Sequence, residues 1–549
     1  MNDRSHHAPL YEALLAYRES GNRSYHVPGH KNGQAYRRMP TKTEGEGVRV
    51  EDAIPSGAAV SSEFVGRKTV KGEMDHRSLR SSGTPDTAFM DMMRMDVTEI
   101  TGTDDLHQPE GVILEAQQLA ADCYGAEESF FLVGGSTVGN LSLLLTICNE
   151  PGSVVLVQRN VHKSVIHGLM LAGAKAVFLE PWVDAASGLA VLPSVETVQA
   201  AVQAYPEAKG VLVTSPNYYG MGSDLTPLAE VCHAAGMPLL VDEAHGAHYG
   251  QHPQLPKSAL SCGADGVVQS THKMLSAFTM GAMLHVRGPR INRSLLRQRL
   301  AMVQSSSPSY PLMASLDLAR RHLHVHGAEA FTAGLAAVEA FRRGLAELPR
   351  FRLLQPAQPC AAGYTAQDPF KAVIHDGAGV LSGYRLQQQL EARGCVPEMS
   401  DERYVVLLFS LGSTMQDAEH LLRALDEIDQ ANRPGQELLP QPDSGVGMTY
   451  ISTWNNLENA KPFSDPVPFS LQPVLEGDMS SVSIEESVGH ISSEMITPYP
   501  PGIPLVYPGE RITSAMAARL KLLSQEGAKF HGVYDPRLQT LKIKKDGVH

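Results

Sequence analysis

The chain of 549 residues is longer than one hydrophobic core usually supports, so its length predicts two or three domains. With 43% hydrophobic and 19% charged residues, most of the chain is expected to be globular. The formal net charge of −13 argues against a nucleic-acid binder, which would present a basic face, and is compatible with a cationic substrate or with a simple solubility role.

The cysteines and the apolar runs bear on the compartment in which the protein works. The six cysteines are scattered and form no CxxC pair, which predicts a reduced protein with neither disulfides nor a metal site. The first residues are too polar for a secretory signal, and no apolar run approaches the roughly 18 residues of a membrane helix. We therefore expect a cytoplasmic protein that does not bind membranes.

Alternating strand and helix patterns dominate the middle of the chain. A helix is expected first at Pro9–Ser20, before an irregular insertion at about 41–90. Strands are then expected at Phe130–Val133, Val154–Val157, Ala176–Leu179, Val211–Val213, Pro238–Val241, Gly266–Val268 and Ala282–Val286. Helices are expected between them at Thr137–Cys148, Lys163–Ala172, Ser194–Ala204 and Leu225–Ala235. This alternation predicts an α/β fold with a mostly parallel, seven-stranded sheet covered by helices on both faces.

Two further units are expected after the sheet. Helical stretches at Met313–His324 and Ala328–Ala346 lead into a mixed α/β segment, and a late helix is expected at Thr513–Gln525. The predicted domains are an N-terminal segment at 1–100, a large domain at 101–310, a small α/β domain at 311–432, a linker at 433–475 and a C-terminal domain at 476–549. The linker is predicted from its richness in Pro, Gly, Asn and Ser.

Three groups of polar residues follow predicted strands and so are expected at one edge of the sheet. The first strand runs into the turn Gly134–Asn140, which opens a helix and suits an anion because glycines and a helix N-terminus expose backbone N–H groups. Asp242-Glu-Ala-His245 and Ser270-Thr-His-Lys273 follow two later strands. Each group alone has an ordinary structural alternative: a helix cap, a turn-capping carboxylate, a structural histidine or a surface lysine.

Together the three groups predict more than each does alone. Lys273 lies between apolar runs, and lysine is the residue whose amine forms Schiff bases. Asp242 precedes it by one strand–helix–strand crossover and offers a partner for a basic nitrogen. A cofactor with a phosphate, an aldehyde and a pyridine nitrogen uses all three groups, and pyridoxal 5′-phosphate is that cofactor.

These motifs, in this order, resemble the Orn/Lys/Arg decarboxylase family, a group of fold-type I, aspartate-aminotransferase-like pyridoxal-phosphate enzymes. The matching stretches are Tyr25-HVPGHK-Asn32, Thr98-EITGTDDLHQPEG-Val112, Gly134-GSTVGN-Leu141, Arg159-NVHKSV-Ile166, Ser215-PNYYG-Met221, Val241-DEAHGAH-Tyr249, Gln269-STHK-Met274, Ser305-SSPSYPLMASLDLAR-Arg321 and Pro498-YPPGIPLVYPGE-Arg511. They extend from about residue 8 to about residue 535, which is far more specific than any single motif.

The resemblance implies a reaction and a set of roles. The reaction is α-decarboxylation of arginine, lysine or ornithine to a di- or polyamine precursor, through a Schiff base on Lys273. The implied catalytic residues are Lys273, Asp242 at the pyridine nitrogen, His162 stacked over the ring and His245 close to it. The implied phosphate contacts come from Gly135, Ser136, Thr137, Ser270 and His272, and Ser306 is expected to serve the cofactor of a neighbouring subunit in a homodimer or higher oligomer.

The chain also departs from the family pattern in three places. Ser306-Ser-Pro-Ser309 differs by one residue from the family's usual Thr-Ser-Pro-Ser, and Met280 stands where many members have a glutamine after the lysine. The segment at 41–90 interrupts a stretch that is short in most relatives. The resemblance is to the form without an N-terminal regulator-like domain, so decamers are not expected. An aminotransferase, a β-eliminating lyase and a catalytically impaired relative remain alternatives, and Glu494, Glu510, Asp104 and Asp105 are the acidic candidates for reading the substrate side chain.

Overall fold

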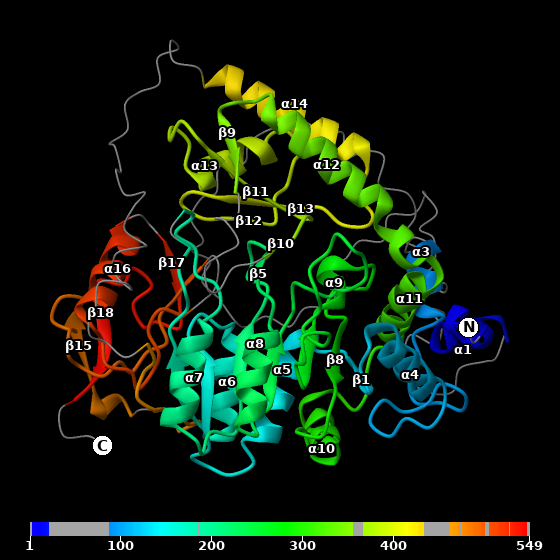
Figure 1. Ribbon diagram of the computed structural model, residues 1–549, viewed down its shortest axis with the longest axis horizontal. Coiled ribbons are helices and arrows are strands. Elements are labelled where there is room, and N and C mark those ends of the chain that lie inside the picture. The colour runs from blue at the N-terminus through cyan, green and yellow to red at the C-terminus, as the bar shows by residue number, and fades with distance from the viewer. Residues whose placement is uncertain are drawn as a thin grey trace, which may run out of the picture.

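The computed structural model describes residues 3–20, 87–184, 186–354, 366–432, 462–472, 475–499, 504–525 and 528–545. Figure 1 shows a large sheet with its helices, a smaller layered unit above it and a C-terminal unit at one side. The predicted motif at residues 25–32 and residues 41–86 of the predicted insertion lie outside these ranges. The last residues of that insertion begin helix α3 (Thr87–Met93).

The large sheet contains all seven predicted strands and one more. Its spatial order is β1-β8-β7-β6-β4-β2-β3-β14. The strands are β1 (Glu128–Leu132), β2 (Val154–Gln158), β3 (Lys175–Leu179), β4 (Val211–Thr214), β6 (Leu239–Asp242), β7 (Gly266–Gln269), β8 (Ala282–Val286) and β14 (Val467–Pro468). The five strands from β7 to β3 are parallel, whereas β8 and β14 run antiparallel to their neighbours. The predicted seven-stranded, mostly parallel sheet is confirmed, and β14 extends it at one edge.

Both faces of this sheet are covered by helices, because successive side chains of a strand point to opposite faces. Leu156 and Val213 belong to one apolar cluster, and their neighbours Val155 and Leu212 belong to the other. The first face packs against α4 (Val112–Tyr124), α7 (Val195–Ala204), α8 (Thr226–Ala234) and α11 (Tyr310–His326). The second face packs against α5 (Gly135–Ile147), α6 (Lys163–Ala172) and α10 (Arg293–Val303). The sheet is therefore the buried middle layer of the large domain.

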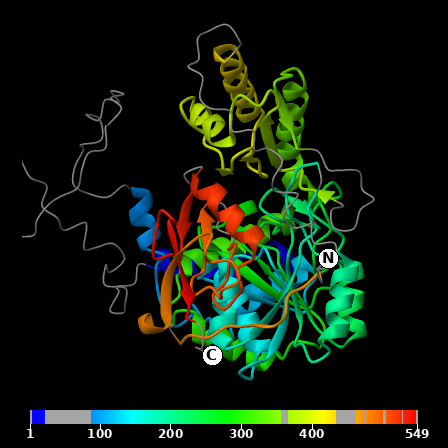
Figure 2. The ribbon, with the colours of Figure 1, turned by 90° about the vertical axis from the view of Figure 1, so that its left-hand side faces the viewer.

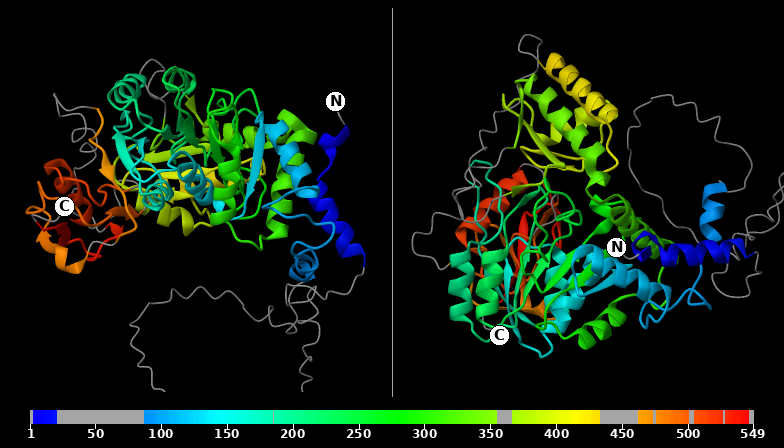
Figure 3. Two further views of the ribbon diagram at one scale, coloured as in Figure 1. Left: turned by 90° about the horizontal axis from the view of Figure 1, so that it is seen from below. Right: turned by 45° about the vertical axis from the view of Figure 1, so that its right-hand side comes forward.

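The N-terminal helix lies against the large domain. Helix α1 (Pro9–Glu19) packs beside α11 and α4, as Figure 3 shows. Leu10 and Leu14 are fully buried there, and the backbone N–H of Leu10 donates to the Asp317 carboxylate of α11 at 3.2 Å. Asp317 also pairs with the buried Arg320.

A second sheet forms the smaller unit that Figure 2 shows standing above the large one. Its order is β12-β13-β11-β9, all antiparallel. The strands are β9 (Phe351–Leu353), β11 (Lys371–Asp376), β12 (Met399–Ser400) and β13 (Val405–Leu408), and the helices are α12 (Thr332–Ala346), α13 (Gly383–Glu391) and α14 (Met415–Ala431). A short ladder between β5 (Met221–Gly222) and β10 (Ala366–Gln367) joins this unit to the large domain.

The C-terminal unit contains α16 (Ser514–Gln525) and two strand pairs. The pairs are β15 (Met479–Ser483) with β18 (Thr540–Lys544), and β16 (Thr497–Tyr499) with β17 (Lys529–His531). A buried ion pair between Arg159 and Glu510 and the stacking of Tyr507 on Phe178 attach this unit to the large domain. The segment predicted as a linker thus contributes β14, just before this unit begins. The remaining predicted domain boundaries stay predictions.

Candidate active site

Asp242, His245 and Lys273 come together at the carboxyl edge of the large sheet. Parallel strands β6 and β7 lie side by side, with Asp242 opposite Val268 in register. Asp242 is the last residue of β6, and the one-turn helix α9 (Thr271–Met274) places Lys273 just beyond β7. The Lys273 Nζ lies 3.0 Å from Nε2 of His245. The structure therefore joins the amine and the histidine that the sequence predicted, beside the predicted carboxylate.

Asp242 is held rigidly by two donors. It is 3% exposed, and its Oδ2 accepts a hydrogen bond of 2.8 Å from the Asn140 side chain. Its Oδ1 accepts from the backbone N–H of Ala244 at 3.1 Å. Two donors hold the carboxylate in one orientation, so this arrangement suits a partner for a protonated ring nitrogen. Asn140 lies within the Gly134–Asn140 sequence motif, and the sequence alone does not indicate this contact.

His162 belongs to the same polar network. It caps the N-terminus of α6, where its Nδ1 accepts from the Ser164 backbone N–H at 3.2 Å and lies 2.9 Å from the Ser164 Oγ. That hydroxyl in turn accepts from Asn140 at 3.0 Å. Burial lowers the pKa of His162 although Asp242 opposes the shift, so the ring is held neutral. A neutral, oriented imidazole is suited to packing against an aromatic cofactor.

One buried hydroxyl at the edge of the sheet has no partner. The Oγ of Ser270 is fully buried and makes no hydrogen bond within the described part of the chain. A buried hydroxyl without a hydrogen-bond partner is unusual unless a ligand supplies that partner. Near it, His272 is held by Gly281, whose carbonyl oxygen lies 2.9 Å from the His272 Nδ1. The Ser270 hydroxyl is therefore available to donate a hydrogen bond to an anion.

Helix α5 offers the second part of an anion site. Its first residue, Gly135, has φ +75°, a conformation that favours glycine. Ser136 and Thr137 follow, both half-buried in the first turn of the helix. The Gly135 N–H donates to the carbonyl of Met280 at 2.9 Å, which ties this turn to the loop after α9. Met280 itself has φ +76° and a side chain that is 51% exposed.

Burial lowers the pKa of the basic nitrogens in this cluster. Burial lowers the pKa of Lys273, while Asp242 and Glu398 partly oppose the shift. Burial lowers the pKa of His245 well below its ordinary value, and the neighbouring Lys371 and Lys273 lower it further. Tyr218 covers the cluster, with its ring centroid 4.7 Å from the His245 ring and 5.8 Å from the Lys273 amine. Burial thus makes the free-base form of the Lys273 amine easier to reach than it is in water.

Lys371 is a member of this cluster that the sequence did not identify. It is the first residue of β11 in the small sheet and only 2% exposed, and its Nζ lies 3.2 Å from Nδ1 of His245. Burial lowers its pKa to about 8, although Asp368 and Glu398 oppose the shift. In the sequence it is one lysine at the start of an apolar run, and nothing there indicates contact with a residue 126 positions earlier.

All four acidic candidates for substrate recognition have structural partners. Asp104 accepts backbone N–H groups at the start of α4, and Glu494 accepts those of Tyr534 and Lys542. Glu510 is paired with Arg159. Asp105, the fourth candidate, accepts the backbone N–H of His107 through its side chain. These contacts account for the carboxylates without a ligand.

Ser306 is not joined to the cluster. It is exposed, on the loop between α10 and α11, and no hydrogen bond links it to the site residues within the described ranges. Its predicted role with a neighbouring subunit therefore stays a prediction. No group of three or more potential metal ligands is present among the described residues. Within those ranges, no helix is long and apolar enough to cross a membrane.

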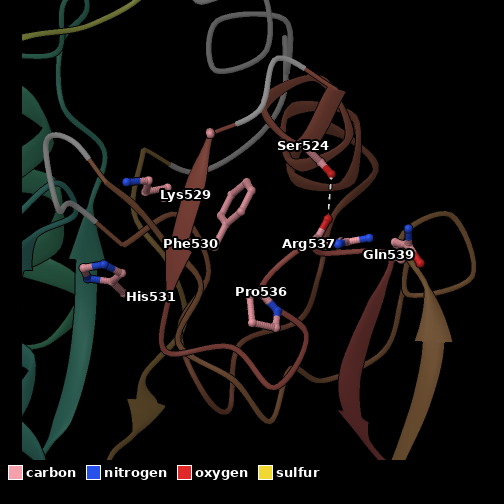
Figure 4. A pocket seen from close by; sticks show the side chains of 8 residues that line it. Ser524, Lys529, Phe530, His531, Pro536, Arg537 and Gln539 are labelled. Carbon is pink, nitrogen blue, oxygen red and sulfur yellow. Dashed lines mark hydrogen bonds between the residues drawn. The ribbon is translucent and has the colours of Figure 1, made fainter. Parts of the chain in front are cut away.

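A hollow of about 640 Å³ lies elsewhere, on the C-terminal unit (Figure 4). It is lined by Ser524, Ala528, Lys529, Phe530, His531, Pro536, Arg537 and Gln539. None of the predicted site residues lines it. Because the reactive groups are gathered at the sheet edge, we place the chemistry there and not in this hollow.

The residues at the sheet edge fit pyridoxal 5′-phosphate in the chemistry of their donors. Lys273 offers a half-buried amine for the aldehyde, and Asp242 offers a carboxylate held by two hydrogen bonds for the ring nitrogen. Ser270 offers for the phosphate a buried hydroxyl that has no partner among the described residues. The topology of the large sheet, with these residues at its carboxyl edge, is that of the fold-type I pyridoxal-phosphate enzymes.

Comparison with known proteins identifies the family within this class. The model of the Orn/Lys/Arg decarboxylase major domain matches residues 87–375, and that of the C-terminal domain of the same family matches residues 468–549. The chain belongs to the Orn/Lys/Arg decarboxylase family, as its motifs predicted.

Several relatives resemble nearly the whole chain. "Uncharacterized protein YaaO" of Bacillus subtilis is 38% identical over 94% of each chain, and an arginine decarboxylase of Halalkalibacterium halodurans is 29% identical over 99% of each. Lysine decarboxylase LdcA of Pseudomonas aeruginosa is 26% identical over 94% of this chain and 75% of its own. Among solved structures, the Francisella novicida lysine decarboxylase LdcF has a TM-score of 0.74 at 22% identity, covering 98% of this chain and 81% of its own, which supports the fold.

Proposed function

We propose that the protein decarboxylates a basic amino acid (arginine, lysine or ornithine) with pyridoxal 5′-phosphate bound covalently to Lys273. The observation that carries the proposal is the half-buried Lys273 amine, 3.0 Å from a neutral His245, at the sheet edge that also holds Asp242. Family membership supports a decarboxylation, and relatives named arginine or lysine decarboxylase support a basic substrate.

Each residue of the cluster has a role in this proposal. Pyridoxal phosphate, when bound, would supply an electron sink for the pair of electrons released as carbon dioxide leaves. Asp242 would keep the ring nitrogen protonated by pairing with it, and His162 would pack against the ring. The phosphate would be held by Gly135, Ser136, Thr137, Ser270 and His272. Lys273 or His245 would return a proton to the α-carbon, because both nitrogens lie within one buried cluster.

We place the recognition of the distal cation of the substrate at Glu398. This carboxylate is exposed, just before β12, and its negative charge acts on both Lys273 and Lys371. The acidic candidates proposed from sequence have other partners, whereas Glu398 is close enough for its charge to act on both amines. An ammonium or guanidinium of the substrate would therefore gain a charge partner at this side.

The proposed assembly is a homodimer or a higher homo-oligomer. Ser306 is exposed and separate from the Lys273 cluster, which agrees with a role at the cofactor of a second copy. The products would be di- or polyamine precursors, and the expected compartment is the cytoplasm.

The test is to reconstitute the purified chain with pyridoxal phosphate and to supply arginine, lysine and ornithine separately. We expect equal amounts of amine and carbon dioxide from at least one of them. Lys273→Ala should abolish both products and the visible absorbance of the lysine–cofactor bond, while Lys257→Ala, at an exposed ion pair, should change neither. Formation of a keto acid in place of an amine would show an aminotransferase and contradict the proposal.

A further inference from the structure

Two lysine amines flank one histidine in the site. Nζ of Lys273 lies 3.0 Å from Nε2 of His245, and Nζ of Lys371 lies 3.2 Å from Nδ1 of the same ring. Lys273 comes from the large domain, and Lys371 comes from the first position of β11 in the small sheet. The ring therefore bridges an amine of the proposed cofactor site and an amine of the other domain.

The protonation states of these three groups are not independent. A neutral imidazole has one N–H and one lone pair, and an ammonium can donate but cannot accept. His245 is neutral, because burial and the two amines oppose its charging. Both hydrogen bonds can therefore exist together only if the lysine that accepts the imidazole N–H is a free-base amine, while the other lysine donates an N–H to the ring lone pair. The two lysines together then carry at least one proton fewer than they would in water.

The surroundings of Lys371 allow its amine to be either the ammonium or the free base. Its amine forms no ion pair with a carboxylate among the described residues, and the only hydrogen bond of that amine there is to His245. A buried ammonium without a paired carboxylate is costly, which brings the free base within reach. Room for the side chain is made by Gly220, where a Cβ would lie 2.7 Å from the Cβ of Lys371. The amine is thus built into the contact between the two domains.

We propose that Lys371, through His245, takes up the proton that Lys273 must lose before its amine can bond to the cofactor aldehyde. In this step the N–H bond of Lys273 breaks as Nε2–H forms, and the Nδ1–H bond of His245 breaks as a third N–H bond forms on Lys371. The total charge of the three groups stays at one positive charge. Lys273 is left as a free-base nucleophile. Lys371 is a positioning residue here, since it contacts His245 and acts only through it.

Other charges around this chain of groups set its balance. The groups that act on the three members are Asp242, Glu398, Asp368, His162 and His272. Asp242 and Glu398 stabilise the charge on Lys273, while Asp368 and Glu398 stabilise it on Lys371. The pKa of Lys371 is lowered to about 8, close enough to neutrality for the proton to be exchanged. Because carboxylates stabilise a positive charge on either lysine, the proton is not fixed to one of them by charge alone.

This inference rests on the proposed function only in taking Lys273 as the cofactor lysine. The experiment adds pyridoxal phosphate to the full-length, cofactor-free protein and follows the appearance of the lysine–cofactor absorbance over a range of pH. We expect Lys371→Met to slow this rate about tenfold near neutral pH and to raise the pH of half-maximal rate by about one unit, since one pH unit is a tenfold change in free amine. Lys529→Met, at an exposed lysine, should match the unaltered protein.

A second variant separates the relay from a purely structural role. His245→Gln removes the bridge and should produce the same shift, and the double variant should add nothing further, because both changes interrupt one path. This variant also decides the matter if Lys371→Met does not fold. An unchanged pH of half-maximal rate in either folded variant, or additive shifts in the double variant, overturns the relay. Absence of the absorbance in the unaltered protein would instead overturn the proposed function.

Discussion

Asn140 and Asp242, 102 residues apart in the chain, are joined by a buried hydrogen bond of 2.8 Å. Asn140 is the sixth residue of α5 and is 1% exposed, and its second contact is to the Ser164 hydroxyl beside His162. One amide thus aligns the carboxylate proposed for the ring nitrogen with the histidine proposed to pack on the ring. This relationship makes Asn140 as important to the site as the charged residues.

Replacing Asn140 with Ala should weaken cofactor binding. The variant leaves the buried Asp242 carboxylate with one donor fewer, and a hydrogen bond to a charged group is worth about 1.5–3 kcal/mol. We expect the dissociation constant for pyridoxal phosphate, measured by equilibrium dialysis, to rise at least about tenfold, which corresponds to about 1.4 kcal/mol. Thr146→Ala is the matched control, because its hydroxyl only bonds within the same helix. Equal affinity in both variants would remove Asn140 from the site.

Ser270→Ala should weaken cofactor binding without lowering the stability of the cofactor-free protein. The Ser270 hydroxyl is buried and has no partner in the described part of the chain, so its loss should leave the free energy of unfolding of the cofactor-free protein within about 0.5 kcal/mol of the unaltered value or raise it. Affinity for pyridoxal phosphate should fall severalfold. Ser164→Ala is the contrasting variant, since its hydroxyl has two partners, and it should lower stability with or without cofactor. A cofactor-free protein destabilised by Ser270→Ala would contradict this interpretation.

Much of the large domain was predictable from local pattern. All seven predicted strands are present because a parallel sheet buried on both faces needs continuous apolar runs, which are easy to recognise. The rule that a site lies at the carboxyl ends of the strands then brought Asp242 and Lys273 together. Strand β14 escaped prediction, because two residues in a proline-rich stretch carry no periodicity and pair only once β3 is in place.

The residues missed in the site share a different cause. Lys371 and Asn140 each act through a partner more than 100 positions away in the chain, and no local spacing reports such a contact. Their burial decides their importance, and burial of a lysine or an asparagine depends on the finished tertiary packing. Conversely, Glu510 is a candidate for substrate recognition by its sequence, but in the structure its carboxylate is paired with Arg159.

That pairing predicts how the C-terminal unit is attached. Arg159 and Glu510 are both buried, and Tyr507 stacks on Phe178 beside them with ring centroids 4.3 Å apart. Removing one partner of a buried ion pair typically costs about 3–5 kcal/mol. We expect Glu510→Leu to lower the free energy of unfolding by about that amount in urea titrations.

The matching double variant checks the cause. Arg159→Met combined with Glu510→Leu should recover much of the stability lost in the single variant, because no uncompensated charge then remains. Glu180, 3.8 Å from Arg159, limits this recovery, because it loses its own partner in the double variant. Simple additivity of the two single losses would show that the pair does not hold the unit in place.

The buried amine of Lys371 predicts a pH dependence of stability with a definite sign. Its pKa is lowered from the ordinary 10.5 to about 8 by burial, so between these values the unfolded chain binds the proton and the folded chain does not. Stability therefore rises with pH across this window, by about 3 kcal/mol at about 1.4 kcal/mol for each unit. Denaturant titrations at several pH values should show this rise for the unaltered protein relative to Lys371→Met, which lacks the group. The variant should be the more stable of the two near pH 7, and parallel pH profiles would mean that Lys371 is not held as an unpaired buried cation.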